Sequence, residues 1–165
     1  MQKTFLGKTK NGKDVFVDLE KSNAATHFKD SPHLQKLVSE ALGRIELHGE
    51  HIREEVDMGC VIGKAGVVET SENDEIIYAL RPHRERYSRF VKNRTSKDTQ
   101  YITLDLRRDS KDSYDLYTAF VGRLTPSFPG GDYLPEQSVD FWSNHALIWG
   151  QQEIVPGTET KECPW

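Results

Sequence analysis

One stretch of the chain carries apolar residues at the three- and four-residue spacing of a helix: Leu34, Leu37, Val38, Leu42 and Ile45. This spacing predicts a helix over residues 32–45. Ser31 followed by Pro32 supports that start, because a serine cap and a proline at the first helical position are typical of helix N-termini. Residues 21–30, just before the helix, have no periodicity and are predicted to form a loop.

Elsewhere the apolar residues alternate with polar ones or form short runs, as they do in strands. Residues 3–6 and 14–19 flank Asn11-Gly12, a pair that tolerates positive φ at both positions and therefore predicts a hairpin. Further strands are predicted at 60–62 and 67–70, as one interrupted strand or as two, and at 75–80, 88–92, 101–106 and 114–124. Residues 125–136, rich in proline and glycine, are predicted to be a loop, and residues 138–149 a short helix that runs into a last strand.

These elements predict an α+β fold in which an N-terminal hairpin and a helix pack on a mainly antiparallel β-sheet. With 165 residues, 36% of them hydrophobic and 29% charged, the chain is expected to form one domain over residues 1–150, followed by a polar C-terminal tail over 151–165. No apolar run approaches the roughly 18 residues of a membrane span, and the first residues lack an apolar signal core. We therefore expect a cytoplasmic protein with no membrane partner.

Charge is distributed unevenly along the chain. The arginine-rich segment, residues 81–97, contains seven cations, namely Arg81, Arg84, Arg86, Arg89, Lys92, Arg94 and Lys97, and only one anion, Glu85. The segment therefore carries +6, and because the whole chain carries −4, the other residues sum to −10. Cations interleaved with Tyr87 and Phe90 are what a site for a phosphate backbone needs. The alternative is an edge strand whose arginines pair with the protein's own acids.

The segment HGEHIREEV, residues 48–56, brings two histidines close together in the sequence. It has three interpretations: a metal site with Glu54 or Glu55 as a further ligand, exposed histidines at the end of a charged helix, or a general base for catalysis. Gly49 weakens the helix that would aim both rings at one ion. No phosphate-binding P-loop, dinucleotide, zinc-protease, serine-hydrolase or CxxC motif is present. We expect neither a metal nor another cofactor.

The order of these segments resembles the barnase–EndoU–colicin–RelE-like nuclease superfamily, which comprises small metal-independent ribonucleases of toxins, phages and mobile elements. The resemblance covers about residues 31–149. It consists of the predicted helix, the segment HGEHIREEV, an arginine-bearing strand (YSRFVKNR), a strand with an internal hydroxyl residue (LYTAFVG) and a terminal segment (DFWSNHALIW). The resemblance implies a metal-independent endoribonuclease, with RNA as a partner and an inhibitor or immunity protein as a further one.

Cleavage of RNA by attack of its own 2′-hydroxyl needs a general base, a general acid and fixed cations around the phosphorus. Histidine can act as base or acid at neutral pH, and arginine supplies charge without transferring a proton. We therefore expect His51 to be the base, Arg89 to hold the phosphate, Thr118 to donate to a phosphate oxygen and His145 to be the acid or a stacking partner. Further phosphate or RNA contacts are expected from His48, Arg86, Lys92 and Arg94.

Each of these roles has a structural alternative. The alternative for Thr118 is an ordinary strand residue, that for His145 a hydrogen-bonded packing residue, and that for Arg89 a solvent-facing neighbour of a buried Phe90. The competing function is a non-catalytic interaction module that uses the arginine-rich segment to bind nucleic acid or an acidic partner. The sequence does not indicate an oligomeric state.

Overall fold

A computed structural model of the protein describes residues 3–20 and 31–165, so the loop predicted at 21–30 lies outside the described residues. The contacts divide the chain into two compact units. Unit 1 contains the residues up to Gly63 together with Thr99–Arg123, and unit 2 contains Lys64–Asp98 together with Leu124–Trp165. The chain therefore passes between the units three times, and each unit combines segments that are distant in the sequence.

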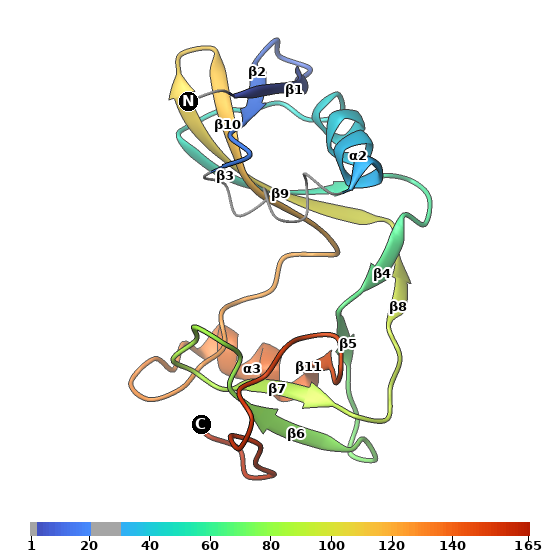
Figure 1. The fold of residues 1–165 in the computed structure, drawn as a ribbon, viewed down its shortest axis with the longest axis vertical. Helices are drawn as coiled ribbons and strands as arrows, with labels where there is room; N and C mark the ends of the chain where they lie inside the picture. Colours follow the sequence, from blue (N-terminus) through green and yellow to red (C-terminus); the bar gives the residue numbers. More distant parts are fainter. Residues whose placement is uncertain (1–2, 21–30) are drawn as a thin grey trace. The chain divides into compact units, whose positions relative to one another are not determined.

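Unit 1 is built on a five-stranded sheet of order β1-β2-β10-β9-β3 (Figure 1). Its strands are β1 (Thr4–Lys8), β2 (Asp14–Val17), β3 (His51–Asp57), β9 (Tyr101–Ser110) and β10 (Ser113–Val121). Neighbouring strands are antiparallel except β2 and β10, which are parallel. The long hairpin of β9 and β10 forms the centre, and β3 pairs with the free side of β9.

Helix α2 (Pro32–Leu42) covers one face of this sheet. Neighbouring residues determine where the helix begins: the Ser31 hydroxyl accepts a hydrogen bond from the backbone N–H of Leu34 at 3.2 Å. The helix buries Leu37, Val38, Ala41 and Leu42 in a core that also contains Leu104 and Leu106 of β9. The predicted helix is confirmed, although it ends at Leu42 and not at Ile45, which is buried in the same core.

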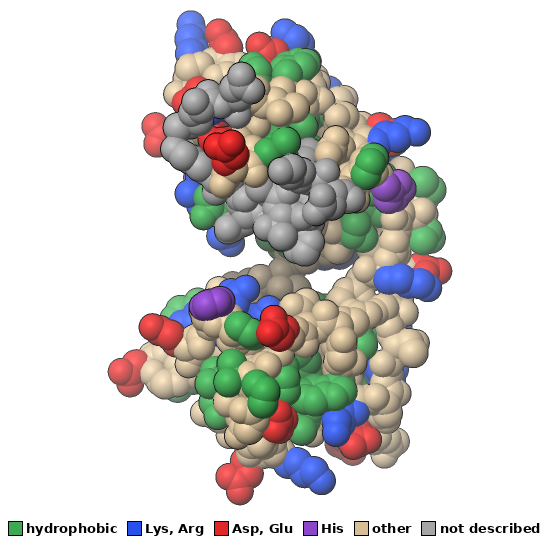
Figure 2. Space-filling view, in the orientation of Figure 1, with side chains coloured by type: hydrophobic (Ala, Val, Ile, Leu, Met, Phe, Trp, Pro, Cys, Tyr) green, Lys and Arg blue, Asp and Glu red, His purple; other side chains and the backbone are tan. Residues whose placement is uncertain are grey.

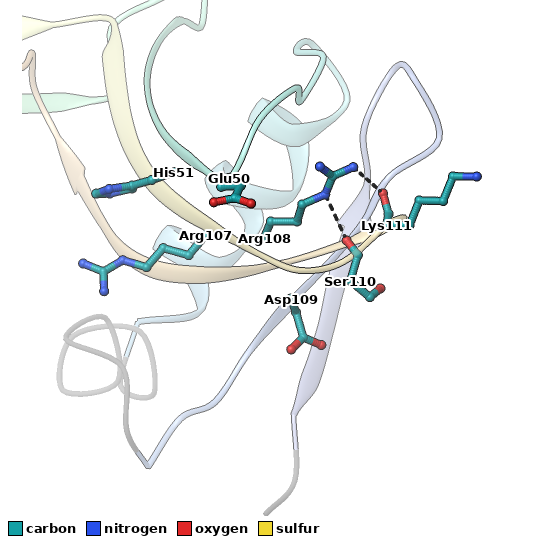
Figure 3. A pocket seen from close by; sticks show the side chains of 7 residues that line it. All are labelled: Glu50, His51, Arg107, Arg108, Asp109, Ser110 and Lys111. Carbon is teal, nitrogen blue, oxygen red and sulfur yellow. Dashed lines mark hydrogen bonds between the residues drawn. The ribbon is translucent and has the colours of Figure 1, made fainter.

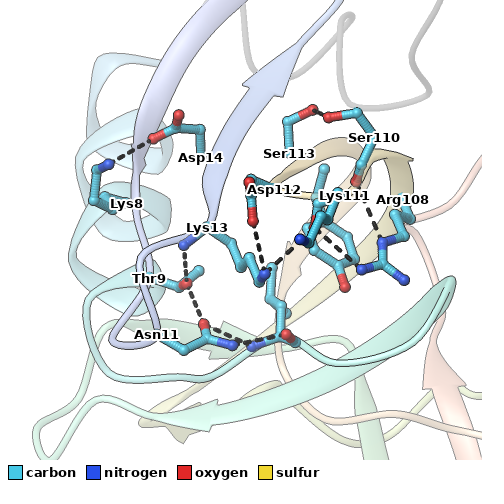
Figure 4. Close-up of polar contacts among 12 residues, drawn as sticks. Lys8, Thr9, Asn11, Lys13, Asp14, Arg108, Ser110, Lys111, Asp112 and Ser113 are labelled. Carbon is cyan, nitrogen blue, oxygen red and sulfur yellow. Dashed lines mark hydrogen bonds and ion pairs between the residues drawn. The ribbon is translucent and has the colours of Figure 1, made fainter.

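The N-terminal hairpin is also confirmed: β1 and β2 are antiparallel, and Gly12 in the turn has a φ of 79°. The turn is tied to the rest of unit 1 (Figure 4). The Asn11 side chain accepts from the N–H of Leu47 at 3.1 Å and donates to its carbonyl at 2.8 Å. The Lys13 ammonium donates to Asp112 in the β9–β10 turn at 3.1 Å, and this bond lowers the pKa of the Asp112 carboxyl.

Unit 2 is built on a four-stranded sheet of order β5-β11-β7-β6. Its strands are β5 (Val67–Glu69), β6 (Ile76–Ala79), β7 (Ser88–Val91) and β11 (His145–Ile148), of which β7 and β11 are parallel. Helix α3 (Glu136–Asn144) leads directly into β11. Phe90 and Leu147 lie in one buried cluster with Trp142 of α3, whereas Val91 and Ile148 lie in another. A separate two-stranded ladder joins β4 (Gly63–Ala65) and β8 (Lys97–Thr99).

The C-terminal segment belongs to unit 2. Tyr78 of β6 and Thr160 exchange two backbone hydrogen bonds of 2.8 Å, and the Trp165 ring meets the Tyr78 ring edge to face at 5.4 Å. Hydrophobic side chains gather around this segment on the face drawn in Figure 2. The sequence analysis separated residues 151–165 from a domain over 1–150; the contacts group them with unit 2, and the number of independently folding domains stays a prediction.

The α+β class is confirmed, but several strands differ from the prediction, among them β8 at 97–99, which the sequence analysis did not predict. Residues 60–62 are irregular, so the strand predicted there is wrong, and β4 begins only at Gly63. Residues 51–57 form β3, which the sequence analysis did not predict. The spacing of Ile52 and Val56 fits a helix and a strand equally well, and pairing with β9 decides between them. None of the described helices is both long and apolar enough to cross a membrane.

Candidate functional site

A buried carboxylate surrounded by cations lies on the sheet face of unit 1 opposite α2. In the register of β3 and β9, His51 is opposite Arg107 and Arg53 is opposite Asp105, which places all four side chains on one face. The Asp105 carboxylate is 2.9 Å from His51 Nε2, 3.3 Å from Arg53 Nε and 3.9 Å from Arg107 Nε. Only 9% of the Asp105 side chain is exposed. We call these four residues the Asp105 cluster.

The contact with Asp105 orients the His51 ring. Nε2 faces the carboxylate, and 47% of the side chain stays exposed. Thr118 is the register partner of Asp105 on β10, beside a bulge at Tyr117. The predicted residues His51 and Thr118 therefore lie on the two strands that flank Asp105 of β9.

An open cavity of about 860 Å³ adjoins the Asp105 cluster. It is lined by Glu50, His51, Arg107, Arg108, Asp109, Ser110 and Lys111 (Figure 3). Figure 3 shows His51 and Arg107 extending to the same side, away from Arg108. Arg108 donates to the backbone carbonyls of Ser110 and Lys111 at 3.2 and 3.1 Å, and this holds its guanidinium at the other end of the cavity.

The metal interpretation of HGEHIREEV finds no support in this arrangement. His48 precedes β3, is highly exposed and lies 3.6 Å from Glu46. Glu54 is opposite the core residue Leu104, so its position lies on the helix side of the sheet, away from His51. Among residues 3–20 and 31–165, no group of three or more histidine, cysteine, aspartate or glutamate residues is placed to hold a metal ion.

The other two predicted catalytic residues lie in unit 2. Arg89 donates to the Thr70 hydroxyl at 2.8 Å and to the backbone carbonyl of His145 at 3.0 Å. The His145 ring stacks on Phe141 with centroids 4.0 Å apart, and its Nδ1 is 2.9 Å from the Phe141 carbonyl. These contacts favour the alternative in which both side chains support the fold.

Strand alternation separates the two side chains further. Leu147 shares a cluster with Phe90, so His145, two residues before Leu147, lies on the Phe90 side of the sheet. Arg89 alternates with Phe90 and lies on the opposite side. The structure does not bring the imidazole of His145 and the guanidinium of Arg89 to one face.

The cations of the arginine-rich segment have few acidic partners. Arg94 Nε is 2.7 Å from an Asp74 oxygen, and this bond lowers the pKa of the Asp74 carboxyl and raises that of Arg94. Within the described part of the chain, Arg94 is the only one of the seven cations within 4.0 Å of a carboxylate. Arg86 lies 4.3 Å above the ring of Tyr133, and Lys92 lies 5.3 Å from that of Trp149. Pairing with the protein's own acids therefore explains Arg94 alone.

Sequence reasoning missed a pocket of about 440 Å³ at the start of this segment. Arg81, Arg84 and Arg86 line it together with residues from the 125–128 loop and from Trp142 and Leu147. We call it the Arg81 pocket. The cluster of arginines was visible in the sequence, but its contact with a loop more than 40 residues away was not.

Comparison of the chain with protein-family models, with curated proteins and with solved structures gave no match. The resemblance to the metal-independent nuclease superfamily therefore stays a prediction.

Proposed function

We propose that this chain binds RNA through the arginine-rich segment of unit 2. The observation that carries the proposal is that six of the seven cations in residues 81–97 lack a carboxylate partner among the described residues. The chain has 26 acidic residues, more than enough to neutralise these cations, yet across residues 3–20 and 31–165 only Asp74 does so. Neighbouring cations without counter-charges repel one another, and a phosphate backbone would remove that repulsion.

The aromatic rings beside the cations also suit a single strand. Arg86 and Lys92 lie against Tyr133 and Trp149, and 41% of Tyr133 is exposed. Proteins that bind single-stranded nucleic acid commonly combine a cationic groove with rings on which bases stack. Arginine predominates in the segment, and its planar guanidinium binds phosphate oxygens in pairs.

The test measures binding of a labelled single-stranded RNA by fluorescence anisotropy as the salt concentration rises. Each released counterion contributes about 0.7 to the slope of log K against log salt for a single strand. Replacing Arg84, Arg86 and Lys92 by glutamine should therefore reduce the slope by about 2.

The matched control replaces three exposed cations of unit 1, Lys10, Lys36 and Arg44, by glutamine and so changes the net charge equally. It should leave most of the affinity intact. Equal losses in both triple variants, or no binding at low salt, would refute the proposal.

A second candidate function, metal-independent cleavage of RNA, is favoured by the contact of His51 with Asp105. A carboxylate that fixes the ring leaves Nδ1 ready to take the proton of the 2′-hydroxyl, whose oxygen then attacks phosphorus while the bond to the 5′-oxygen breaks. Arg107 and Arg53 would hold the phosphate and Thr118 would donate to one of its oxygens. Water would protonate the departing 5′-oxygen, because His145, the predicted acid, belongs to unit 2 and packs on Phe141 there.

This candidate is tested by incubating RNA with the protein in excess EDTA and analysing the products for 2′,3′-cyclic phosphate ends. Replacing His51 by alanine should reduce the cleavage rate by about 10²- to 10⁴-fold. His48→Ala is the control, because it also removes a histidine and His48 lies outside the Asp105 cluster. Cleavage that survives in His51→Ala, or that disappears in EDTA, would contradict this mechanism.

A further inference from the structure

We propose that the Arg81 pocket binds a phosphate monoester carried by a nucleoside, such as the phosphorylated end of an RNA chain. The inference rests on the proposed RNA binding and specifies which part of the ligand enters the fold. It concerns a concave site within unit 2, as distinct from the exposed cations along the rest of the segment.

The pocket has two kinds of lining. Its polar wall carries Arg81, His83, Arg84, Glu85, Arg86, Thr125 and Ser127, and its apolar part is formed by Pro126, Phe128, Trp142 and Leu147. A volume of about 440 Å³ lies in the usual range of small-ligand pockets, which is roughly 300–1,000 Å³. A ligand with a charged group at one end and a ring or sugar at the other matches both parts.

The charge of the lining matches a monoester better than a diester. Three arginines and one glutamate leave a formal charge of +2. A phosphate monoester carries about −1.5 to −2 at neutral pH, whereas each phosphodiester in the interior of a strand carries only one negative charge. Charge-assisted bonds from guanidinium groups to phosphate oxygens are among the stronger hydrogen bonds in proteins.

Arg81 is a part-buried cation without a carboxylate partner among the described residues. Its Nε donates to the Ser88 hydroxyl at 2.8 Å, and no described carboxylate lies within 4.0 Å. Burial, and to a lesser extent the charge of Arg84, lower the pKa of the Arg81 guanidinium to about 10. Burial therefore destabilises the charged form of Arg81, and a bound anion would offset that effect.

A hydrogen-bonded turn fixes the backbone on the arginine side of the pocket. The N–H of Arg84 bonds to the carbonyl of Arg81 at 3.2 Å, closing a turn in which His83 has a φ of 62°. A non-glycine residue in this left-handed region is uncommon and tends to occur at functional sites. The turn carries Arg81 and Arg84 at its two ends.

The loop that forms the other side is held as well. Trp142 Nε1 donates to the Pro126 carbonyl at 2.9 Å, and the rings of Phe128 and Trp142 stack with centroids 3.8 Å apart. The apolar side is therefore rigid, and a nucleoside would bind it without reorganising the loop.

The experiment compares, with the full chain, one RNA sequence in 5′-phosphate, 3′-phosphate and 5′-hydroxyl forms, and adds adenosine monophosphate, adenosine and inorganic phosphate as competitors. We expect about tenfold tighter binding of at least one phosphorylated end, because bonds from guanidinium groups to phosphate oxygens are charge-assisted and therefore stronger than neutral ones. We also expect competition by the monophosphate but not by adenosine. Comparing the affinity for phosphorylated RNA with that for adenosine monophosphate shows whether the pocket prefers the end of an RNA chain or a free nucleotide.

Arg81→Gln should abolish the preference for phosphate while retaining binding of the 5′-hydroxyl RNA. Arg84→Gln, at an exposed position, should reduce the same preference and serves as a second variant in case Arg81→Gln misfolds. Arg44→Gln in unit 1 is the charge-matched control and should keep the preference.

Binding of 5′-hydroxyl RNA with no gain from either terminal phosphate and no competition by the monophosphate would overturn this inference and leave the proposed RNA binding standing. Loss of binding to every RNA would overturn the proposed function itself.

Discussion

The two units treat their surface cations differently. In unit 1, His51, Arg53 and Arg107 converge on a single buried acid, Asp105, whose carboxylate offsets part of the charge of the two arginines. In the arginine-rich segment of unit 2, only Arg94 is paired with an acid within the described residues, and the Arg81 pocket holds three arginines against one glutamate. Arginines thus pair with an internal acid on the sheet of unit 1, whereas in the segment of unit 2 most of them stay available to bind an anion.

This difference separates the two candidate functions. A general base needs a fixed orientation and a partner that holds its ring, which the Asp105 cluster supplies to His51. Binding of a polyanion needs cations that are not already satisfied, which unit 2 supplies. A protein that binds and cleaves RNA would use both the Asp105 cluster and the arginine-rich segment, and substitutions can disable either one without changing the other.

The largest expected effect concerns whether the units are independent. Trp142→Ala in unit 2 and Leu104→Ala in unit 1 both remove fully buried side chains, at a cost of about 3–5 and 2–5 kcal/mol respectively. If the units fold independently, hydrogen exchange measured by mass spectrometry should accelerate only in the mutated unit. Faster exchange in both units from either substitution would support the single domain that the sequence predicts.

The next effect follows from making unit 2 resemble unit 1. Ser127 is exposed and lines the Arg81 pocket, so Ser127→Glu places a carboxylate beside unpaired guanidinium groups. We expect RNA affinity, measured by anisotropy, to fall by about tenfold, because a formed ion pair removes cations from the phosphate. Ser127→Gln controls for side-chain size. An equal fall in both variants would show that shape and not charge is responsible.

A smaller effect is expected from making unit 1 resemble unit 2. Asp105→Asn removes the acid that holds the cluster and frees Arg53 and Arg107. The slope of log K against log salt for RNA should then steepen by about 0.7 for each cation that reaches a phosphate. The same variant should lose any cleavage activity, since the His51 ring loses its anchor. An unchanged slope would show that these cations do not reach the strand.

The smallest effect is the pH dependence of the surface pairs. The Asp74 carboxyl has a pKa below its usual 3.8, chiefly because of its bond with Arg94, so it favours the folded state above about pH 4 and loses that contribution as the pH falls further. Denaturant titrations should therefore show wild type and Asp74→Asn differing most near neutral pH and converging in acid. Asp112, paired with Lys13 in unit 1, should behave in the same direction. A difference that grew in acid would contradict this sign.

Local signals in the sequence predicted elements whose causes are local. The serine cap and proline before α2, the Asn-Gly turn between β1 and β2, and the alternation in β6, β7, β9 and β10 all lead to the observed structure. The positive charge of residues 81–97 was also evident. What failed was β3, because its apolar spacing suits two kinds of element and its partner β9 lies about 50 residues further along.

The candidate site divides in the same way. The sequence by itself determined which side chains carry chemistry: the titratable ring of His51, the hydroxyl of Thr118 and the excess of arginine. Only the tertiary structure decided their partners, because the contacts of His51 with Asp105 and of Arg89 with Thr70 and His145 depend on strand register. Register is set by which apolar residues are buried together, and a shift of one residue would turn every one of these side chains to the opposite face.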